Sequence, residues 1–455
     1  MHLKKGTEVT VRIERLVFGG RGIGDFEGRK VFVDHTVPGD EVKVRLTRIK
    51  PNYAEAKLVE VVKPSEDRVK PRCKHFDTCG GCSWQFLPYE KQCEVKEQQV
   101  RDALERIGRL NSTLVEPLIP CEEPWFYRNK MELSFGADEN GKAMLGFYPP
   151  GYHFEVFDLE ECFLESEEMP GLVKDIRDFA HEFDIKPFNK ETHEGVLRNL
   201  VIREGKNSGE RMLILLTQGS NFDRLKEFKK RFEKDPRITS LYWTAVHQVP
   251  GKRTFQEAEH LAGKETVKEI LHLENGSSLE FEILPEAFFQ TNTKQTEVLY
   301  SKVLELAELS GDETVLDLYS GTGTIGLFCA HKAGKVIGIE INEDAVESAI
   351  RNAQRNRIEN VNFILGKVED ELPPLKGKTD LIIVDPPRSG LGPEVTEVVA
   401  SFEAKKIVYV SCNPSTLARD LQQFAALGYA CRRVIPIDLF PQTSHVECVC
   451  VLEKN

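Results

Sequence analysis

The sequence contains no long hydrophobic run. No apolar segment approaches the ~20 residues that a membrane-spanning helix needs, and the charged start, Met1 to Lys5, does not have the form of a signal peptide. Low-complexity tracts and internal repeats are also absent, which excludes repeat architectures. We therefore expect a protein that has no membrane partner and that is located in the cytoplasm.

Disulfide bonds are not expected either, although the chain contains eleven cysteines. The cytoplasm keeps thiols reduced, so these cysteines are better explained as metal ligands, nucleophiles or packed side chains. No sequence feature points to an obligate protein partner.

Negative charge predominates over the whole chain, whose formal net charge is −12. Residues 1–74 differ, since they contain 17 Lys and Arg but 11 Asp and Glu, whereas the remaining residues contain 44 and 62. A basic head on an acidic body is typical of a nucleic-acid-binding module joined to an enzyme. An ordinary solvated surface explains the same charge equally well, so charge alone does not decide.

The length of 455 residues suggests roughly three domains. Residues 1–63 contain five short runs of alternating apolar and polar side chains separated by glycine turns, which predicts a small closed barrel of the OB type. Such barrels often bind oligonucleotides, but many are only structural. Residues 64–289 mix helical and strand-like runs, including a predicted helix over 89–109, and we assign them to a middle α+β domain.

Residues 290–455 alternate strands and helices regularly, which predicts an α/β domain with a doubly wound parallel sheet. Strands are expected at 314–319, 335–340, 361–365, 380–385 and 406–411. The last two expected strands, 432–437 and 445–451, are joined by a short loop that permits only antiparallel pairing. A parallel sheet closed by an antiparallel hairpin is the class I arrangement of S-adenosylmethionine-dependent methyltransferases.

A glycine-rich turn follows the first expected strand of this domain. Gly321, Gly323 and Gly326 allow the backbone to approach a cofactor and the helix to start close to the sheet. The next strand ends at Glu340, where an acid can bind both hydroxyls of a ribose, or can be merely solvated. These two features predict a nucleotide cofactor without choosing between NAD and S-adenosylmethionine, and the terminal hairpin favours the latter.

Cys412 lies at the carboxyl end of the expected strand 406–411, and Pro414 then ends that strand. Open α/β sheets place their chemistry at this edge. A buried packing cysteine is the ordinary alternative. The strand-end position and the Asn-Pro turn favour a reactive thiol that faces the cofactor.

Three more cysteines, Cys73, Cys79 and Cys82, cluster on one glycine-containing loop. Clustered thiolates bind soft metals. Zinc, with His75 as a further ligand, is one interpretation, although structural zinc sites favour paired ligands on both halves. Three clustered cysteines and one remote cysteine is a pattern that iron–sulfur clusters use.

Cys162 is the best remote fourth ligand, with Cys93 and Cys121 as competitors. Cys93 falls within the helix predicted over 89–109 and is better explained as a packed side chain.

On these residues the chain resembles the RNA uracil-5-methyltransferase family, and most of all its iron–sulfur branch that methylates 23S ribosomal RNA. The resemblance covers essentially the whole chain, and the head resembles a TRAM domain. The matching segments are Phe289 to Asn292, Asp317 to Tyr319, Asp385 to Arg388, Ser411 to Pro414 and His445 to Glu447. One departure is Ser320, where family members often have cysteine.

The resemblance implies roles for particular residues. Cys412 and Glu447 match the catalytic pair, and the four cysteines match the ligands of a [4Fe–4S] cluster. The residues expected to contact S-adenosylmethionine are Gln290, Tyr319, Asp385 and, from the glycine-rich motif, Glu340. The expected cluster ligands are Cys73, Cys79, Cys82 and Cys162.

The chemistry of uracil explains this pair of catalytic residues. C5 of uracil is a poor nucleophile, and addition of a thiolate to C6 converts the ring into an enolate with electron density at C5. After methyl transfer, a base must remove the C5 proton so that the thiol can leave. Cys412 suits the first role and Glu447 the second, although a strand glutamate in isolation is usually a solvated residue. A stacked base must first be flipped out.

Four functional readings are considered. The leading one is formation of 5-methyluridine in 23S rRNA, and its nearest rival has the T-loop of tRNA as substrate. A rival of another class is a non-catalytic iron–sulfur protein that binds RNA, against which the intact set Cys412, Glu447 and Asp385 argues. A small-molecule methyltransferase leaves the basic head unexplained.

Overall fold

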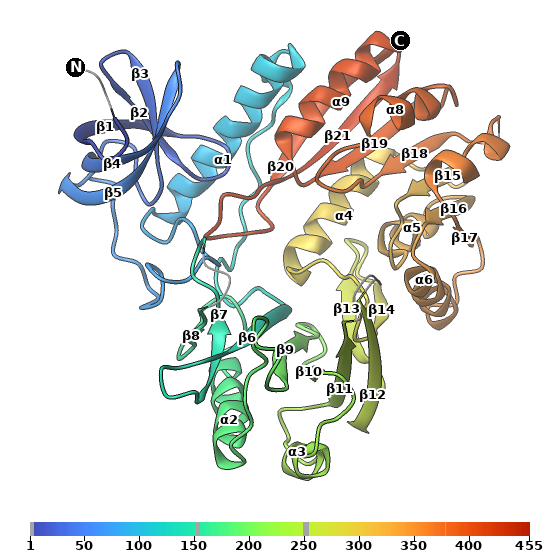
Figure 1. The fold of residues 1–455 in the computed structure, drawn as a ribbon. Coiled ribbons are helices and arrows are strands. Elements are labelled where there is room, and N and C mark those ends of the chain that lie inside the picture. Colours follow the sequence, from blue (N-terminus) through green and yellow to red (C-terminus); the bar gives the residue numbers. More distant parts are fainter. Residues whose placement is uncertain (1–3, 152–154, 249–253, 378) are drawn as a thin grey trace.

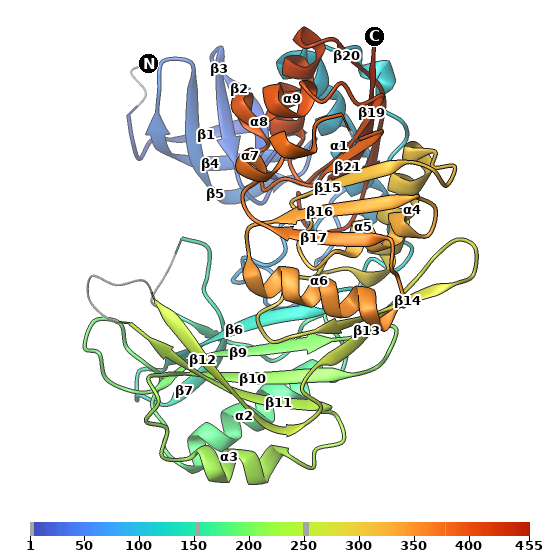
Figure 2. The ribbon, with the colours of Figure 1, turned by 90° about the vertical axis from the view of Figure 1, so that its right-hand side faces the viewer.

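The computed structural model describes residues 4–151, 155–248, 254–377 and 379–455. The barrel at the N-terminus and the C-terminal α/β domain lie on either side of helix α1 (Tyr89–Ala103) (Figure 1). The middle domain, in green, lies below both of them in Figures 1 and 2. Across the described ranges, none of the helices combines the length and the apolar character that crossing a membrane requires.

The N-terminal strands form a closed barrel, as predicted, in the order β1-β2-β3-β5-β4. The strands are β1 (Glu8–Leu16), β2 (Gly22–Phe26), β3 (Arg29–Val33), β4 (Glu41–Ile49) and β5 (Tyr53–Lys63). Alternate residues of β1, such as Val9, Val11 and Ile13, are buried inside, while their neighbours are exposed. Every second side chain therefore points into a small core. Closure of the barrel leaves no free sheet edge.

Helix α1 does not continue to residue 109 as one regular helix. Its last turn, Leu104–Gly108, is π-helical and ends at Arg109 in the left-handed conformation. The turn packs on helix α9 (Pro414–Ala426) so closely that a Cβ on Gly108 would lie 3.1 Å from the carbonyl oxygen of Ala418. A side chain at this crossing would require the two helices to shift by a few tenths of an ångström.

The middle domain is built on a seven-stranded sheet in the order β12-β11-β10-β9-β6-β7-β8. Its strands are β6 (Lys130–Ala137), β7 (Ala143–Phe147), β8 (Phe157–Asp158), β9 (Leu197–Glu204), β10 (Arg211–Gln218), β11 (Ser240–His247) and β12 (Phe255–Gly263). Helices α2 (Met169–Glu182) and α3 (Leu225–Phe232) cover one face (Figure 2). Only β10 and β11 are parallel.

A separate antiparallel ribbon, β13 (Val267–His272) with β14 (Ser278–Ile283), follows this sheet. Its buried residues belong to the same hydrophobic core as helix α4 (Thr293–Ala307) and the C-terminal sheet. The ribbon therefore packs with the C-terminal domain, although it precedes residue 290. The domain boundaries placed from the sequence stay a prediction.

The C-terminal sheet confirms the predicted class I methyltransferase fold, with the order β17-β16-β15-β18-β19-β21-β20. Its strands are β15 (Thr314–Leu318), β16 (Lys335–Glu340), β17 (Val361–Leu365), β18 (Leu381–Val384), β19 (Lys406–Ser411), β20 (Tyr429–Ile437) and β21 (Glu447–Lys454). The first five are parallel, and β21 pairs antiparallel with both β19 and β20.

Helices cover both faces of this sheet. One core contains residues of α4, α5 (Thr324–Ala330) and α6 (Glu343–Arg355). The other contains residues of α7 (Val368–Glu371), α8 (Gly392–Ala400), α9 and, from a distant part of the chain, α1. Helix α1 thus belongs to the packing of the C-terminal domain and links it to the barrel.

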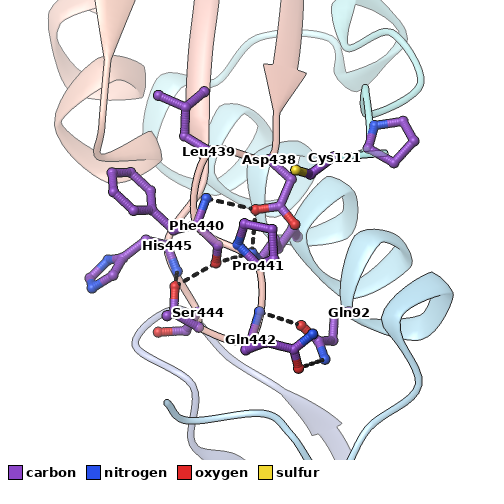
Figure 3. Close-up of polar contacts among 12 residues, drawn as sticks. Gln92, Cys121, Asp438, Leu439, Phe440, Pro441, Gln442, Ser444 and His445 are labelled. Carbon is purple, nitrogen blue, oxygen red and sulfur yellow. Dashed lines mark hydrogen bonds and ion pairs between the residues drawn. The ribbon is translucent and has the colours of Figure 1, made fainter. Parts of the chain in front are cut away.

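The loop 438–446, which joins β20 to β21, is fastened to α1 by a buried ion pair (Figure 3). Lys96 Nζ donates to Asp438 Oδ1 at 2.7 Å and to the Phe440 carbonyl oxygen at 3.0 Å, and Tyr89 donates to Asp438 Oδ2 at 3.0 Å. Both charged side chains are fully buried. Burial lowers the pKa of Lys96, and the attraction of Asp438 opposes that shift.

A reciprocal pair of amides adds to this attachment. The Gln442 backbone nitrogen donates to Gln92 Oε1 at 2.9 Å, and Gln92 Nε2 donates to Gln442 Oε1 at 3.0 Å. The backbone nitrogens of Ser83 and Trp84 both donate to the Gln442 carbonyl oxygen. Gln442 has a φ of 67°, a left-handed conformation that these contacts stabilise.

The same loop contacts the other parts of the molecule. Tyr127 of the middle domain donates to the Pro441 carbonyl oxygen at 2.9 Å, and Asn292 donates to the Leu439 carbonyl oxygen at 3.1 Å. A Cβ added to Gly20 of the barrel would lie 3.1 Å from Ser444. The loop immediately before Glu447 is therefore held by every domain.

Replacing Lys96 by methionine should lower the free energy of unfolding by about 3–5 kcal/mol, because Asp438 is then left as a buried charge without an opposite charge beside it. The second replacement Asp438→Asn in the same chain should recover part of that loss. Urea unfolding measures both. The matched control is Lys91→Met, since Lys91 is exposed on the same helix and pairs with Glu94. Equal stability of Lys96→Met and the control would contradict this role of the ion pair.

Candidate active site

Four adjacent strands bring the predicted site residues to one edge of the C-terminal sheet. Tyr319 follows β15, Asp385 follows β18 and Cys412 follows β19, all at the carboxyl ends of parallel strands. Ser411 pairs with Cys448 across the antiparallel strands β19 and β21, so the next positions, Cys412 and Glu447, lie opposite each other.

The turn after Cys412 connects two of the predicted motifs. Asn413 caps helix α9, its Oδ1 accepting from the Ser415 backbone nitrogen at 3.0 Å. Its Nδ2 donates to the Arg388 carbonyl oxygen at 3.1 Å, which attaches the loop after Asp385 to the turn after Cys412. Replacing Asn413 would loosen both connections.

Burial raises the pKa of Cys412, Asp385 and Glu447, the three ionisable groups that meet at this edge. Burial first, and then the negative charges of Glu447 and Asp385, raise the pKa of Cys412 to about 11, while the positive charge of Arg388 opposes the shift. Burial raises the pKa of Asp385 to about 7 and that of Glu447 well above its usual range. The thiol is therefore protonated at neutral pH in the substrate-free protein.

His445 lies two residues before Glu447 and is uncharged at neutral pH. Burial, followed by the positive charges of Arg388 and Lys96, lowers its pKa to about 4. Its ring and that of Phe440 lie 5.9 Å apart and point away from α1, on the other side of the loop from Gln92 (Figure 3).

The backbone of the glycine-rich turn binds Glu340, the acid predicted to contact the ribose of the cofactor. The Gly321 nitrogen donates to Glu340 Oε2 at 3.0 Å, and the Asn342 nitrogen donates to Glu340 Oε1 at 2.9 Å. Tyr319 and Gly323 both have positive φ, 63° and 77°. A Cβ on Gly323 would lie 2.6 Å from the Phe363 ring, so a side chain cannot be placed there.

Two pockets adjoin this turn and share Tyr319. One has a volume of about 480 Å³ and is lined by Glu340 as well as by residues that follow β16 and β17. The other is lined by Gln290, Asp385 and the glycine-rich turn. All four residues predicted to contact the cofactor thus line one or both pockets.

Four residues that were not predicted from the sequence, Lys367 to Asp370, line the larger pocket directly after β17. Their position at the carboxyl end of a parallel strand was the signal that could have identified them.

Asp317, within the motif that precedes the turn, is fully buried, and among the described residues neither carboxylate oxygen has a hydrogen-bond partner. Burial and the nearby Asp385 carboxylate raise its pKa to about 8. A buried carboxyl group without partners favours the neutral form, and a positive charge bound nearby would favour the ionised form.

The four predicted cluster cysteines come from two segments that contact each other. The Lys74 backbone nitrogen donates to Glu161 Oε1 at 2.5 Å, and the Glu160 nitrogen donates to His75 Nε2 at 3.1 Å. Burial, aided by the neighbouring Cys79 and Cys162, raises the pKa of Cys82 to about 12. Arg128 is also near, since its charge lowers the pKa of Cys82 and Cys79.

The thiols are neighbours, but their present arrangement does not form a closed site. Among the residues that the structure describes, no three His, Cys, Asp or Glu side chains could hold a metal ion together. The nitrogen of His75 already accepts a hydrogen bond from Glu160. Of the two competing cysteines, Cys93 packs against the core that contains residues of α1, α7, α8 and α9. The sulfur of Cys121 accepts a hydrogen bond from Asn292 Nδ2 at 3.7 Å.

Comparisons with known proteins agree with this geometry. The family model described as tRNA (Uracil-5-)-methyltransferase matches residues 253–455, and the TRAM domain model matches residues 2–59. A protein from Halalkalibacterium halodurans described as an uncharacterized RNA methyltransferase is 37% identical, over 100% of this chain and 98% of that protein. One from Clostridium tetani with the same description is 38% identical, over 99% and 97%.

Among solved structures, the chain is similar to the Pyrococcus abyssi tRNA (uracil-54, C5)-methyltransferase in complex with S-adenosyl-L-homocysteine. The two chains are 31% identical with a TM-score of 0.78, and the match covers 98% of this chain and 100% of that one.

The raised pKa of Asp317 predicts a pH-dependent stability. In the unfolded chain this carboxyl ionises near pH 4, whereas in the folded ligand-free protein it ionises near pH 8. Between these values the folded state retains a proton that the unfolded state has lost, so the stability contribution present below pH 4 is lost as pH rises to about 8. The variant Asp317→Asn lacks this loss.

Urea unfolding at pH 5, 6, 7 and 8 should therefore show the variant gaining stability relative to the native protein by up to ~1.4 kcal/mol per pH unit. A difference between the two proteins that does not change with pH would contradict the assignment.

Proposed function

Because the chain belongs to the RNA uracil-5-methyltransferase family, we propose that it uses S-adenosylmethionine to form 5-methyluridine in 23S ribosomal RNA. The observation that carries the proposal is the pair Cys412 and Glu447, opposite each other at the sheet edge beside the two pockets. A thiol and a carboxyl in this arrangement suit addition to C6 and proton removal from C5.

The first step is attack of the Cys412 sulfur on C6 of a flipped uracil. Since the resting thiol has a pKa of about 11, it must lose its proton when the uracil binds. Arg388 lowers that pKa and is exposed at the site, so it also suits contact with an RNA phosphate or a uracil carbonyl. The carbon–sulfur bond makes C5 nucleophilic.

S-adenosylmethionine supplies a methyl group on a sulfonium, an electrophile that C5 can attack. We assign Glu340 to the ribose hydroxyls, and Gln290, Tyr319 and Asp385 to the remainder of the cofactor, since these four residues line the pockets. Asp317 and Asp385, whose pKa values are raised, would become ionised beside a bound cation.

Glu447, which must be in its ionised form at this stage, then removes the C5 proton. Burial raises the pKa of this carboxyl well above its usual range, so that its ionised form is a stronger base than a solvated glutamate. Proton removal restores the double bond between C5 and C6 and releases the Cys412 sulfur. The loop 438–446, held by Lys96 and Gln92, fixes where this base lies.

Two observations bear on which RNA is the substrate, and they favour different RNAs. The resemblance of the sequence favours 23S rRNA, whereas the similar Pyrococcus abyssi structure is that of a tRNA (uracil-54, C5)-methyltransferase and makes the T-loop of tRNA the second candidate. Incubating purified unmodified 23S rRNA and tRNA with the protein and labelled S-adenosylmethionine, and mapping the modified base, decides between them. Label only in tRNA would exclude the rRNA proposal. The cytoplasmic location stays a prediction.

We also propose a [4Fe–4S] cluster bound by Cys73, Cys79, Cys82 and Cys162. The support is the donor set, four thiols on two contacting segments, with the cation Arg128 beside them. These four thiols would supply the Cys₄ ligand set that such a cluster takes. The methylation needs no electrons, so we assign the cluster a structural role.

Cys412→Ala should abolish methyl transfer and leave S-adenosylmethionine affinity nearly unchanged, because the thiol forms the bond to C6. Glu447→Gln should instead accumulate a methylated covalent RNA–protein adduct, visible as a shifted band in a denaturing gel, because the proton at C5 cannot leave. The control is Cys431→Ala on β20, which should be fully active. Turnover by Cys412→Ala would remove the covalent mechanism.

The protein as purified should be brown and contain about four iron and four sulfide per chain. Cys162→Ser should lose the colour, whereas Cys93→Ser and Cys121→Ser should retain it, because these two side chains lie elsewhere. Metal analysis and visible absorption measure this outcome. Stoichiometric zinc without visible absorption would overturn the cluster proposal.

A further inference from the structure

A further pocket lies between the barrel and the C-terminal domain, outside the cofactor site. It has a volume of about 180 Å³, roughly six times the ~30 Å³ that one water occupies in the liquid. Its walls come from the end of β1, from the last turns of α1 with the π-helical turn, and from the start of α9. Such π-helical turns are frequent at functional sites.

Gln99 of α1 lines this pocket and is only 6% exposed. Within the part of the chain that the structure describes, neither its amide nitrogen nor its amide oxygen has a hydrogen-bond partner. A buried amide without partners costs about 1–3 kcal/mol, so a ligand that supplies a donor and an acceptor would recover this free energy. The side chain contributes no hydrogen bond to the fold that would explain its burial.

The other walls combine apolar and cationic groups. Phe18 and Ile107 are large apolar side chains that are 42% and 41% exposed. Arg15 and Arg106 both pair with Asp102, at 3.0 Å and 3.3 Å, so that two guanidinium groups share one carboxylate and the group has a net positive charge. Both arginines retain further N–H donors.

The position relative to the catalytic edge limits the ligand. Ser415, the remaining wall residue, lies three residues after Cys412 at the start of α9. A strand of RNA that places one base at Cys412 would therefore pass this pocket with a nearby nucleotide. The pocket supplies what a single-stranded nucleotide requires, namely an aromatic face, an amide for the base edge and cations for phosphate.

We propose that this pocket binds a nucleotide close to the target uridine in the substrate RNA, with Gln99 bonded to the base edge, Phe18 against the base and the two arginines at the phosphate. The proposal rests on the proposed function and makes the pocket a determinant of RNA sequence specificity. The amide of glutamine is complementary to a base edge that presents a donor beside an acceptor.

The test uses short transcripts of whichever RNA the native protein methylates, 23S rRNA or tRNA, with each nucleotide near the target replaced in turn by an abasic one. Phe18→Ala and Gln99→Leu, which preserves volume, should each lower kcat/KM for the intact transcript by about 5- to 100-fold. Affinity for S-adenosylmethionine should not change in either variant, because the cofactor pockets are elsewhere. The thermal midpoint should not change in Phe18→Ala, because Phe18 is exposed, and should not fall in Gln99→Leu, because that variant removes a buried amide without partners.

The abasic series identifies the nucleotide. One abasic position should lower kcat/KM for the native protein and cause no further loss in Phe18→Ala. The control is Leu427→Ala, an equally exposed apolar side chain at the other end of α9, which should behave as the native protein at every position.

Native activity in both pocket variants, or equal losses along the abasic series in native and variant proteins, would overturn the pocket proposal while leaving the proposed function intact. If the native protein methylates neither RNA, the proposed function fails, and the pocket proposal fails with it.

Discussion

The ion pair between Lys96 and Asp438 is the interaction on which the active site depends. Two opposite charges without solvent contact are stable only as a bonded pair, so α1 and the loop 438–446 must stay together. The loop leads directly to Glu447, and Gln92 fixes its backbone through Gln442. Helix α1, which lies early in the chain, thereby positions Glu447 near the C-terminus. The barrel and the middle domain contact the same loop.

The catalytic edge is electrostatically costly in the absence of ligands. Asp317 and Asp385 have pKa values raised to about 8 and 7 by burial, and Glu447 and Cys412 are raised as well. These groups favour their neutral forms until a cation or a substrate arrives. The same burial opposes formation of the thiolate that the first step needs, but it makes the ionised carboxylate of Glu447 a stronger base for the last step.

Much of the architecture could be predicted because it follows from local patterns of apolar and polar residues. Alternation with period two gave the barrel, and regular strand spacing gave the C-terminal sheet, with strands 335–340, 361–365 and 406–411 observed as expected. The convergence of Cys412 with Asp385 followed from their strand-end positions. The π-helical turn, the packing of ribbon β13–β14 on α4 and the junction around Asp438 depend on contacts between distant residues, which leave no periodic signal in the sequence.

The central claim is that Cys412 forms a covalent bond to C6 of a uridine in RNA. An RNA substrate with 5-fluorouridine at the target traps this bond, because fluorine at C5 cannot be removed as a proton. Mass spectrometry of the digested complex should find the modified nucleotide, carrying an added methyl group, on the peptide that contains Cys412. An adduct on a different cysteine, or methylation of unsubstituted RNA with no adduct on the fluorinated RNA, would contradict this mechanism.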